Sequence, residues 1–319
     1  MAVLVGIDEA GFGPILGPLV ISSSSFSIPH HLLEADLWLI LKKSVGDKRK
    51  HLAGRLLIAD SKKAHNKRDG IKHLQRSVLA MLKCLDKEPA TLSQLIAILS
   101  PDCLERLGEY PWHQDIETCD ILQDKADIAI ASSVFGDDLA SHDIKLLGLK
   151  SCCLEVAYYN KLVSKVKNKS SVLFTASSQL IKSAWDDLAD DELQIIIDRQ
   201  GGRVHYRKNL QLMFPDVELK ILKETPANSS YELQADGKRM RLHFVVGADD
   251  KFLPVSLASM VSKYLRELLV GNINRYFTGF CPDLKPTAGY WQDGLRFIED
   301  LKTLIPHVTF DSSQLIRSR

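Results

Sequence analysis

The sequence has no long apolar run, no marked excess of one charge and no paired-cysteine motif. No hydrophobic stretch reaches the roughly 20 residues that cross a bilayer, and the N-terminus lacks the basic start and cleavage site of a signal peptide. We therefore expect a cytoplasmic protein that does not contact membranes. A formal net charge of +1 argues against attachment to nucleic acid by bulk charge alone.

The cysteines show neither the spacing of a zinc site nor that of a disulfide framework. There is no CxxC pair and no partnered histidine spacing among the six of them. We interpret them as small buried hydrophobic residues. They are Cys84, Cys103, Cys119, Cys152, Cys153 and Cys281. With 319 residues, 45% of them hydrophobic, the chain can form one large domain or two ordinary ones.

Alternating apolar runs and helical patterns predict an α/β fold. The predicted strands are 3–8, 19–26, 56–59, 193–197, 217–224, 230–234 and 239–246. The predicted helices are 32–43, 67–85, 151–166, 177–188 and 255–276. The region of about 90–150 is predicted to be an insertion of short helices and loops on one side of the core. No internal repeat or low-complexity tract is evident.

The segment from Gly6 to Pro14 is the most informative part of the chain. It places Asp8 and Glu9 after an apolar run and before a turn that contains Gly11 and Gly13. Neighbouring side chains on a strand point to opposite faces, so the two carboxylates share a ligand only if the strand ends there and the turn swings Glu9 round. They would then repel each other unless a cation kept both ionised, which favours a divalent metal site. The alternative is a solvated turn.

Acidic residues also close other apolar strands. Asp198 follows a run of three isoleucines that suits the centre of a sheet. Asp60 ends the predicted strand 56–59, and Asp249 and Asp250 follow the strand 239–246. Carboxylates that converge beyond strand ends bind Mg²⁺ or Mn²⁺ through oxygen, and paired ions of this kind support phosphoryl transfer.

Basic residues gather between positions 48 and 76, where they outnumber the acidic ones. This basic stripe could contact phosphates, although a run of charge on a helix is ordinarily a solvated face. Its members are Lys48, Arg49, Lys50, Arg55, Lys62, Lys63, Lys67, Arg68, Lys72 and Arg76.

In these motifs the sequence resembles the ribonuclease HII family. The matching stretches are Gly6 to Pro14, Asp60-Ser61-Lys62-Lys63, Ile195 to Asp198, and Ala248-Asp249 with the helix from Ser256 to Glu267. They occur in the family's order, and Gly17-Pro18 repeats its second Gly-Pro. The resemblance implies an RNase H-like mixed sheet flanked by helices, with a smaller helical C-terminal part and an insertion before the third acidic strand. We assign 1–276 to the catalytic domain, with the insertion at about 90–150, and 277–319 to a C-terminal helical extension.

The resemblance also implies the chemistry. Asp8, Glu9, Asp198 and Asp249 would bind Mg²⁺ or Mn²⁺ and form the catalytic site. Family enzymes cleave the RNA strand of RNA/DNA hybrids, or cleave 5′ to a ribonucleotide embedded in duplex DNA, and leave 3′-hydroxyl and 5′-phosphate ends. In that register Asp249 is the fourth carboxylate, and we expect Asp250 to begin the following helix. No obligate protein partner is evident.

A second set of residues would bind the nucleic acid. It comprises Gly11, Phe12, Gly13, Ser61, Lys62, Lys63, Arg199, Ser259, Lys263 and Tyr290. Within it, Lys62 and Lys63 would hold backbone phosphates. An ordinary amphipathic helix with its basic residues in water is the alternative for Ser259, Lys263 and the neighbouring Arg266. A buried core tyrosine is the alternative for Tyr290.

One departure from the family pattern concerns substrate recognition. The family has Gly-Arg-Gly where this chain has Gly11-Phe12-Gly13, so the arginine's hydrogen-bond donors are missing at the position that recognises the ribose 2′-hydroxyl. Two other functions therefore stay open. One is a non-catalytic nucleic-acid duplex-binding protein on the same scaffold, and the other is a different RNase H-like nuclease such as a junction resolvase.

Overall fold

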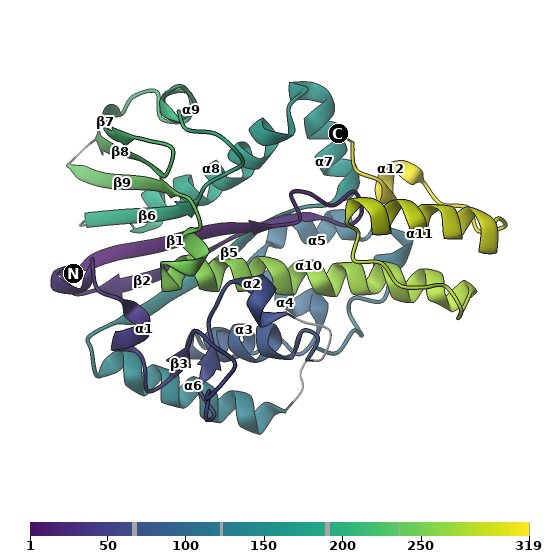
Figure 1. Ribbon diagram of the computed structural model, residues 1–319, viewed down its shortest axis with the longest axis horizontal. Helices are drawn as coiled ribbons and strands as arrows, with labels where there is room; N and C mark the ends of the chain where they lie inside the picture. The colour runs from purple at the N-terminus through teal and green to yellow at the C-terminus, as the bar shows by residue number, and fades with distance from the viewer. Residues whose placement is uncertain (66–68, 122–123, 189–191, 236, 319) are drawn as a thin grey trace.

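A computed structural model describes residues 1–65, 69–121, 124–188, 192–235 and 237–318, so Lys67 and Arg68 of the basic stripe lie outside the described residues. Its centre is a seven-stranded mixed sheet in the order β5-β2-β1-β6-β9-β8-β7, with helices on both faces (Figure 1). The α/β fold class expected from the sequence is confirmed. Among the described residues, no helix combines the length and the apolar character needed to cross a membrane.

The strands of the main sheet vary from seven residues to ten. They are β1 (Ala2–Ala10), β2 (Leu19–Ile28), β5 (Lys145–Leu154), β6 (Glu192–Asp198), β7 (Glu218–Glu224), β8 (Asn228–Ala235) and β9 (Lys238–Val245). A separate two-stranded sheet pairs β3 (Val45–Gly46) with β4 (Leu56–Leu57).

The helices include one long element, α10 (Leu253–Phe280). The others are α1 (Leu37–Ile40), α2 (Ser61–Ala64), α3 (Lys72–Cys84), α4 (Leu92–Leu99), α5 (Pro101–Leu107), α6 (Lys125–Ala140), α7 (Val156–Val166), α8 (Lys169–Leu188), α9 (Arg207–Met213), α11 (Trp291–Leu304) and α12 (Ser312–Leu315). The described residues also form the short 3₁₀ helices η1 (His30–Leu32), η2 (Pro111–His113) and η3 (Ala248–Asp250).

The central strands are buried on both faces, because α10 and α8 cover opposite sides of the sheet (Figure 1). Leu4 of β1 belongs to the core on the α10 side, whereas Val5 and Ile7 belong to the core on the α8 side. At Gly6 the start of α10 packs directly on the strand. A Cβ at that position would lie 2.2 Å from the carbonyl carbon of Pro254, so only glycine allows this approach.

Strand direction brings three carboxyl ends to one edge of the sheet. β1, β6 and β9 are neighbours and run parallel, with Ile7 opposite Ile197 and Asp198 opposite Val245. Parallel strands of an open sheet present their carboxyl ends, and the residues that follow them, on the same side. The edge beyond Ile7, Ile197 and Val245 is therefore where the predicted acidic residues lie.

Several predicted elements differ from the structure. The helix predicted over 151–166 is wrong in its first turn, because residues up to Leu154 form β5 and α7 begins at Val156. The apolar Cys153 is held in this strand by pairing with Val20, a contact distant in sequence. The helix predicted over 32–43 is reduced to η1 and α1, with Asp36 capping the latter. The predicted helix 67–85 begins later, at Lys72, as α3.

Asp60 does not end a strand of the main sheet. The predicted strand 56–59 is confined to Leu56 and Leu57, and its partner is β3. Asp60 instead caps α2, since its side chain accepts a hydrogen bond from the backbone N–H of Lys62 at 2.9 Å. Local capping therefore replaces the strand-end position that the pattern indicated.

The region of about 90–150 contains α4, α5, η2 and α6 and leads into β5, which contributes an edge strand to the main sheet. At the other end of the chain, α11 and α12 follow α10, which runs past the expected boundary at 276 to Phe280. Phe277 and Phe297 share a small core with Leu16, so the C-terminal helices pack against the segment that follows β1. The division at 276 remains a prediction.

Candidate active site

Asp8 and Asp198 lie next to each other at the carboxyl edge of the sheet. Ile7 of β1 and Ile197 of β6 are paired in these parallel strands. Asp8 directly follows the first of them, and Asp198 directly follows the second. Backbone groups hold both carboxylates: the N–H of Glu9 donates to Asp8 Oδ1 at 2.7 Å, and the N–H of Ala248 donates to Asp198 Oδ1 at 2.7 Å. The strand order therefore places two carboxylates side by side.

Glu9 also belongs to this acidic group, although the backbone around it differs from the prediction. The expectation that the strand ends at Asp8 is wrong, because β1 continues to Ala10 through its pairing with β2. Its pairing with β6 stops at Ile7, so the last residues of β1 have a strand neighbour on one side only. Burial, and then the charges of Asp198 and Asp249, raise the pKa of Glu9 to about 8. Glu9 is thus coupled electrostatically to the cluster without a break in the strand.

Asp249 and Asp250 occupy different environments in η3. Burial, followed by repulsion from Asp198 and Asp60, raises the pKa of Asp249 to about 6. Asp250 is exposed and forms an ion pair with Lys63. It does not begin the next helix, as the sequence suggested, because α10 starts at Leu253. Of the two neighbours, Asp249 is the one whose charge interacts with Asp198.

The four carboxylates form a strongly acidic cluster. Burial, and then repulsion from Glu9 and Asp198, raise the pKa of Asp8 well above its usual value. Burial also raises the pKa of Asp198. The positive charge of Lys62 opposes these shifts at Glu9 and Asp249. Oxygen donors that bear this much negative charge suit hard divalent cations such as Mg²⁺ or Mn²⁺.

The carboxylate oxygens are spread more widely than the ligands of a bound ion. Among the described residues, the only three ligand atoms that all lie within 4.8 Å of one another belong to Cys103, Cys153 and Glu155, in a different part of the protein. Ligand oxygens lie about 2.0–2.6 Å from Mg²⁺ or Ca²⁺. The acidic side chains would therefore have to turn inward to share an ion.

Helix α10 forms the inner wall of the site. Ser259, Lys263 and Arg266 are all buried, so the alternative of a water-facing helix is wrong. The Ser259 hydroxyl donates to Ser61 Oγ at 3.1 Å, and it also lies beside the Asp8 carboxylate, whose pKa it lowers. The Lys263 ammonium pairs with Glu267, one turn further along the helix, at 2.6 Å.

Arg266 lies against the loop that contains Gly11. Its Nη2 donates to the backbone oxygens of Ala288 at 2.9 Å and Leu16 at 3.3 Å. Gly11 has a φ of +96°, and a Cβ there would come within 2.8 Å of Arg266 Nε. Glycine is needed at this position both for its backbone conformation and for the close approach of the guanidinium.

Phe12 packs half-buried against the core on the α8 side. The ammonium of Lys169 lies 5.0 Å from the centre of its ring, in the position of a cation–π contact. Gly13 is exposed. The loop is also held from the C-terminal segment, because the guanidinium of Arg317 donates to the backbone oxygens of Gly11 and Pro14. No local sequence pattern points to Arg317.

Some of the other predicted nucleic-acid-binding residues form hydrogen bonds within the protein, and others are exposed. Arg199 donates to the backbone oxygens of Thr225 and Pro226, so it holds the turn between β7 and β8. Lys62 is exposed beside the acidic cluster. Tyr290 is 49% exposed, so the alternative of a buried core tyrosine is wrong. Its ring lies 5.9 Å from the ammonium of Lys263.

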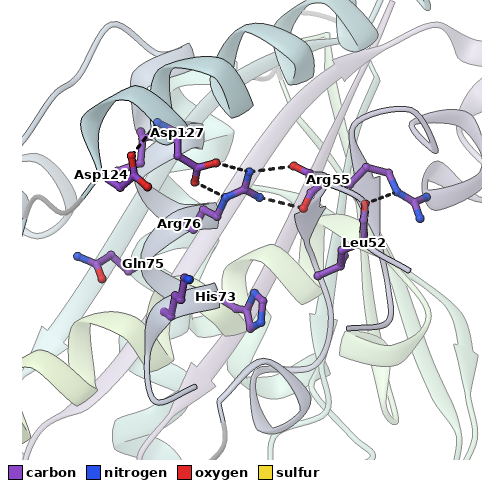
Figure 2. Close-up of a pocket in the computed structure, with 10 residues that line it drawn as sticks. Leu52, Arg55, His73, Gln75, Arg76, Asp124 and Asp127 are labelled. Atoms are coloured by element: carbon purple, nitrogen blue, oxygen red, sulfur yellow. Dashed lines mark hydrogen bonds and ion pairs between the residues drawn. The ribbon is translucent and has the colours of Figure 1, made fainter. Parts of the chain in front are cut away.

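One arginine of the basic stripe forms hydrogen bonds with other parts of the protein. Arg76 binds both carboxylate oxygens of Asp127, at 2.5 and 3.0 Å, and donates to the backbone oxygens of Gly54 and Arg55 (Figure 2). These residues line a cavity of about 380 Å³ together with Lys72. Arg76 therefore has a structural role, whereas several lysines of the stripe are exposed. The exposed lysines are Lys48, Lys50, Lys62, Lys63 and Lys72.

Comparison with protein-family models gives no match, and comparison with curated proteins gives none either. Solved structures do match. The structure is similar to those of ribonucleases HII and HIII. A PCNA:RNase HII complex from Archaeoglobus fulgidus matches at 13% identity and a TM-score of 0.47, over 99% of this chain and 94% of that one. Ribonuclease H2 from Pyrococcus horikoshii OT3 matches at 14% identity and a TM-score of 0.49, over 98% and 92%.

Bst-RNase HIII in complex with Mn²⁺ matches at 13% identity and a TM-score of 0.46, over 99% of this chain and 66% of that one. These matches to ribonucleases HII and HIII concern the fold alone.

Proposed function

We propose that this chain is a metal-dependent endoribonuclease. It hydrolyses the RNA strand of RNA/DNA hybrids, or cleaves at ribonucleotides embedded in duplex DNA, and it leaves 3′-hydroxyl and 5′-phosphate ends. The observation that carries the proposal is the acidic cluster at the carboxyl edge of the sheet, where burial and then repulsion between carboxylates raise the pKa values of Asp8, Glu9 and Asp249, and burial raises that of Asp198. A protein that only bound a polyanion would gain nothing from such a cluster, because carboxylates repel phosphates.

The four carboxylates would hold Mg²⁺ or Mn²⁺. When bound, these ions activate the attacking water and stabilise the leaving oxygen of the phosphodiester. The protein supplies the positions of the ligands. Backbone N–H groups hold one oxygen each of Asp8 and Asp198 in place. Ser259 supports Asp8 from the inner side.

The residues around the cluster would bind the duplex backbone. Lys62 is exposed next to the carboxylates and would contact a phosphate. The exposed ring of Tyr290 would pack on a sugar. Backbone groups of Gly11 and Gly13 would meet the ribose, because Phe12 carries no donor for the 2′-hydroxyl. Lys63 and Arg199 would reach phosphates only by releasing their present partners.

A second candidate function is non-catalytic binding of a nucleic-acid duplex. Phe12 is the observation that favours it, since its ring packs against the core under Lys169 and offers nothing polar to a substrate. Both functions use the exposed lysines, and they differ in the purpose of the acidic cluster. Only the nuclease needs the four carboxylates to stay ionised around a metal.

The experiment is a cleavage assay with labelled duplexes. The protein is incubated with Mg²⁺ or Mn²⁺ and with duplex DNA that carries one ribonucleotide, a run of ribonucleotides or none. We expect cleavage only where ribonucleotides are present, and products whose 5′ ends carry phosphate. Binding to all three duplexes without cleavage in either metal would favour the binding protein. Cleavage of the all-DNA duplex would indicate a different RNase H-like nuclease.

A further inference from the structure

A second group of metal-ligating side chains lies away from the acidic cluster, at the edge of the sheet. Cys103 comes from α5, Cys153 from the end of β5, and Glu155 from the residue that caps α7. Cysteine sulfurs and a carboxylate oxygen of these three residues all lie within 4.8 Å of one another. All three side chains are buried, with exposures of 0%, 1% and 3%. Strand β2 separates β5 from β1, so this group is not part of the acidic cluster.

Only one of the two oxygens of the Glu155 carboxylate has a hydrogen-bond partner. Its Oε2 accepts a hydrogen bond from Arg106 Nε at 2.8 Å, whereas its Oε1 is buried and has no hydrogen-bond partner. A buried acceptor without a partner costs about 1–3 kcal/mol, and more for a charged group. Something should therefore compensate Oε1, and two sulfurs of suitable chemistry are its neighbours.

We propose that Cys103, Cys153 and Glu155 bind one zinc-class cation. Zinc in proteins takes thiolate, imidazole and carboxylate ligands at about 2.0–2.3 Å in a tetrahedral arrangement. Two thiolates and one carboxylate supply three of the four ligands. Of the three ligands, Cys153 lines a cavity of about 330 Å³ together with Ser100 and Arg106, and a water molecule from this cavity would supply the fourth ligand.

The charges of this assembly balance. Binding would release the two thiol protons to solvent and leave two thiolates and one carboxylate, which carry three negative charges. The divalent cation and the Arg106 guanidinium carry three positive charges. A buried group of charges is tolerated when it is paired in this way. Arg106 also orients the carboxylate through Oε2, as outer-shell partners of zinc ligands commonly do.

A disulfide between Cys103 and Cys153 is the competing explanation for the two neighbouring sulfurs. It would bond the sulfurs to each other and leave Glu155 Oε1 without a partner. A cation satisfies all three groups at once. Its function would be structural, since it would tie α5 to the strand and helix that meet at Glu155.

The test uses Co²⁺ as a spectroscopic substitute for zinc, added to the whole protein under reducing conditions. We expect one equivalent to give an intense near-ultraviolet absorption from thiolate-to-cobalt charge transfer. Under the proposed function the acidic cluster would also bind divalent ions, but its oxygen ligands would give no such band. Cys103→Ser and Cys153→Ser should each remove the band, and Glu155→Gln should weaken cobalt binding by about tenfold or more.

Cys152→Ser is the matched control. Cys152 is the sequence neighbour of Cys153, and its thiol donates to Gln179 Oε1 at 3.1 Å. This variant should keep the band and the cobalt affinity of the wild type. The proposal is overturned if the reduced wild-type protein shows no thiolate band. It is also overturned if the Cys103→Ser protein and the Cys153→Ser protein both keep the band. A Cys103–Cys153 crosslink in the native protein, seen as the loss of two hydrogens by mass spectrometry, would also overturn it. The wild-type spectrum needs no variant, so a variant that fails to fold leaves the test intact.

Discussion

The guanidinium of Arg317 donates a hydrogen bond to the backbone oxygen of Gly11, a residue 306 positions earlier in the chain. The same side chain reaches the oxygen of Pro14, and it lies 5.0 Å over the ring of Tyr159. Burial lowers the pKa of Arg317 to about 10, so the group stays charged at neutral pH. The C-terminal segment therefore holds the loop that follows Asp8 and Glu9 in one conformation.

We expect Arg317→Lys to loosen this loop. A single ammonium cannot reproduce the fork of a guanidinium, and backbone oxygens left without donors cost about 1–3 kcal/mol. The free energy of unfolding should fall by that amount, and cleavage of a ribonucleotide-containing duplex should slow more than binding weakens. Arg207→Lys, at an exposed arginine of α9, is the control and should change neither property. Equal behaviour of the two variants would show that Arg317 does not position the loop.

Phe12→Arg should change substrate choice. An arginine at this position would restore donors for sugar and phosphate oxygens, so cleavage at a single embedded ribonucleotide should increase relative to cleavage within a ribonucleotide run. Lys169 would then face a second positive charge instead of a ring, and some stability should be lost. Phe12→Leu keeps an apolar side chain and serves as the control. If Phe12→Arg alters cleavage of no ribonucleotide-containing duplex, the loop is not a recognition element.

The stability of the metal-free protein should fall as the pH rises. The pKa of Glu9 is about 8 in the folded protein against 4.5 ordinarily, because of burial and then the charges of Asp198 and Asp249. A carboxyl group whose pKa is raised by folding is best tolerated below pH 4.5, and its contribution to stability is lost progressively up to about pH 8. A divalent cation should reverse the loss, since it stabilises the ionised carboxylates.

This dependence can be measured by thermal unfolding across that pH range, with a chelator and then with Mg²⁺ or Mn²⁺. The rise in Tm on adding metal should be larger near pH 8 than near pH 5. Glu9→Gln removes the titrating group, and its metal-free Tm should depend less on pH. A wild-type protein whose metal-free Tm rises steadily over the same range would contradict the assignment of Glu9 to a shared, repelling cluster.

Asp249 and Asp250 should respond differently to the same substitution. Asp249→Asn should remove metal-dependent cleavage, because the charge of Asp249 acts on the cluster. Asp250→Asn should only break the exposed ion pair with Lys63, which is worth at most about 1 kcal/mol, and should leave the cleavage rate nearly unchanged. Cleavage rates under saturating metal compare the two proteins. An inactive Asp250→Asn protein beside an active Asp249→Asn protein would place the fourth carboxylate one residue later.

The sequence predicted the centre of the molecule well, because the central strands are continuous apolar runs. Ile195 to Ile197 need burial on both faces, which requires a parallel sheet with helices on each side. The acidic residues that follow such strands could then be placed at one edge. Edge strand β5 was missed, because its position depends on pairing with β2 and its residues 151–154 are also compatible with a helix.

Contacts between distant segments could not be predicted in the same way. Arg317 reaches Gly11 only after the C-terminal helices have packed, and nothing near either residue signals the other. Lys263 and Arg266 have the spacing of an exposed basic helix face, and tertiary packing buries both. Cys103 and Cys153 meet for the same reason, since α5 packs on the end of β5.

The most direct test of the account compares cleavage and binding by the Asp8→Asn protein. Single-turnover cleavage of a duplex with one ribonucleotide is measured with Mg²⁺ and with Mn²⁺, and duplex affinity is measured separately in the presence of a chelator. We expect cleavage to be abolished in both metals, while binding is retained or becomes tighter because one negative charge near the phosphates is removed. Cleavage at the wild-type rate would contradict the account, and loss of folding would assign Asp8 a structural role instead.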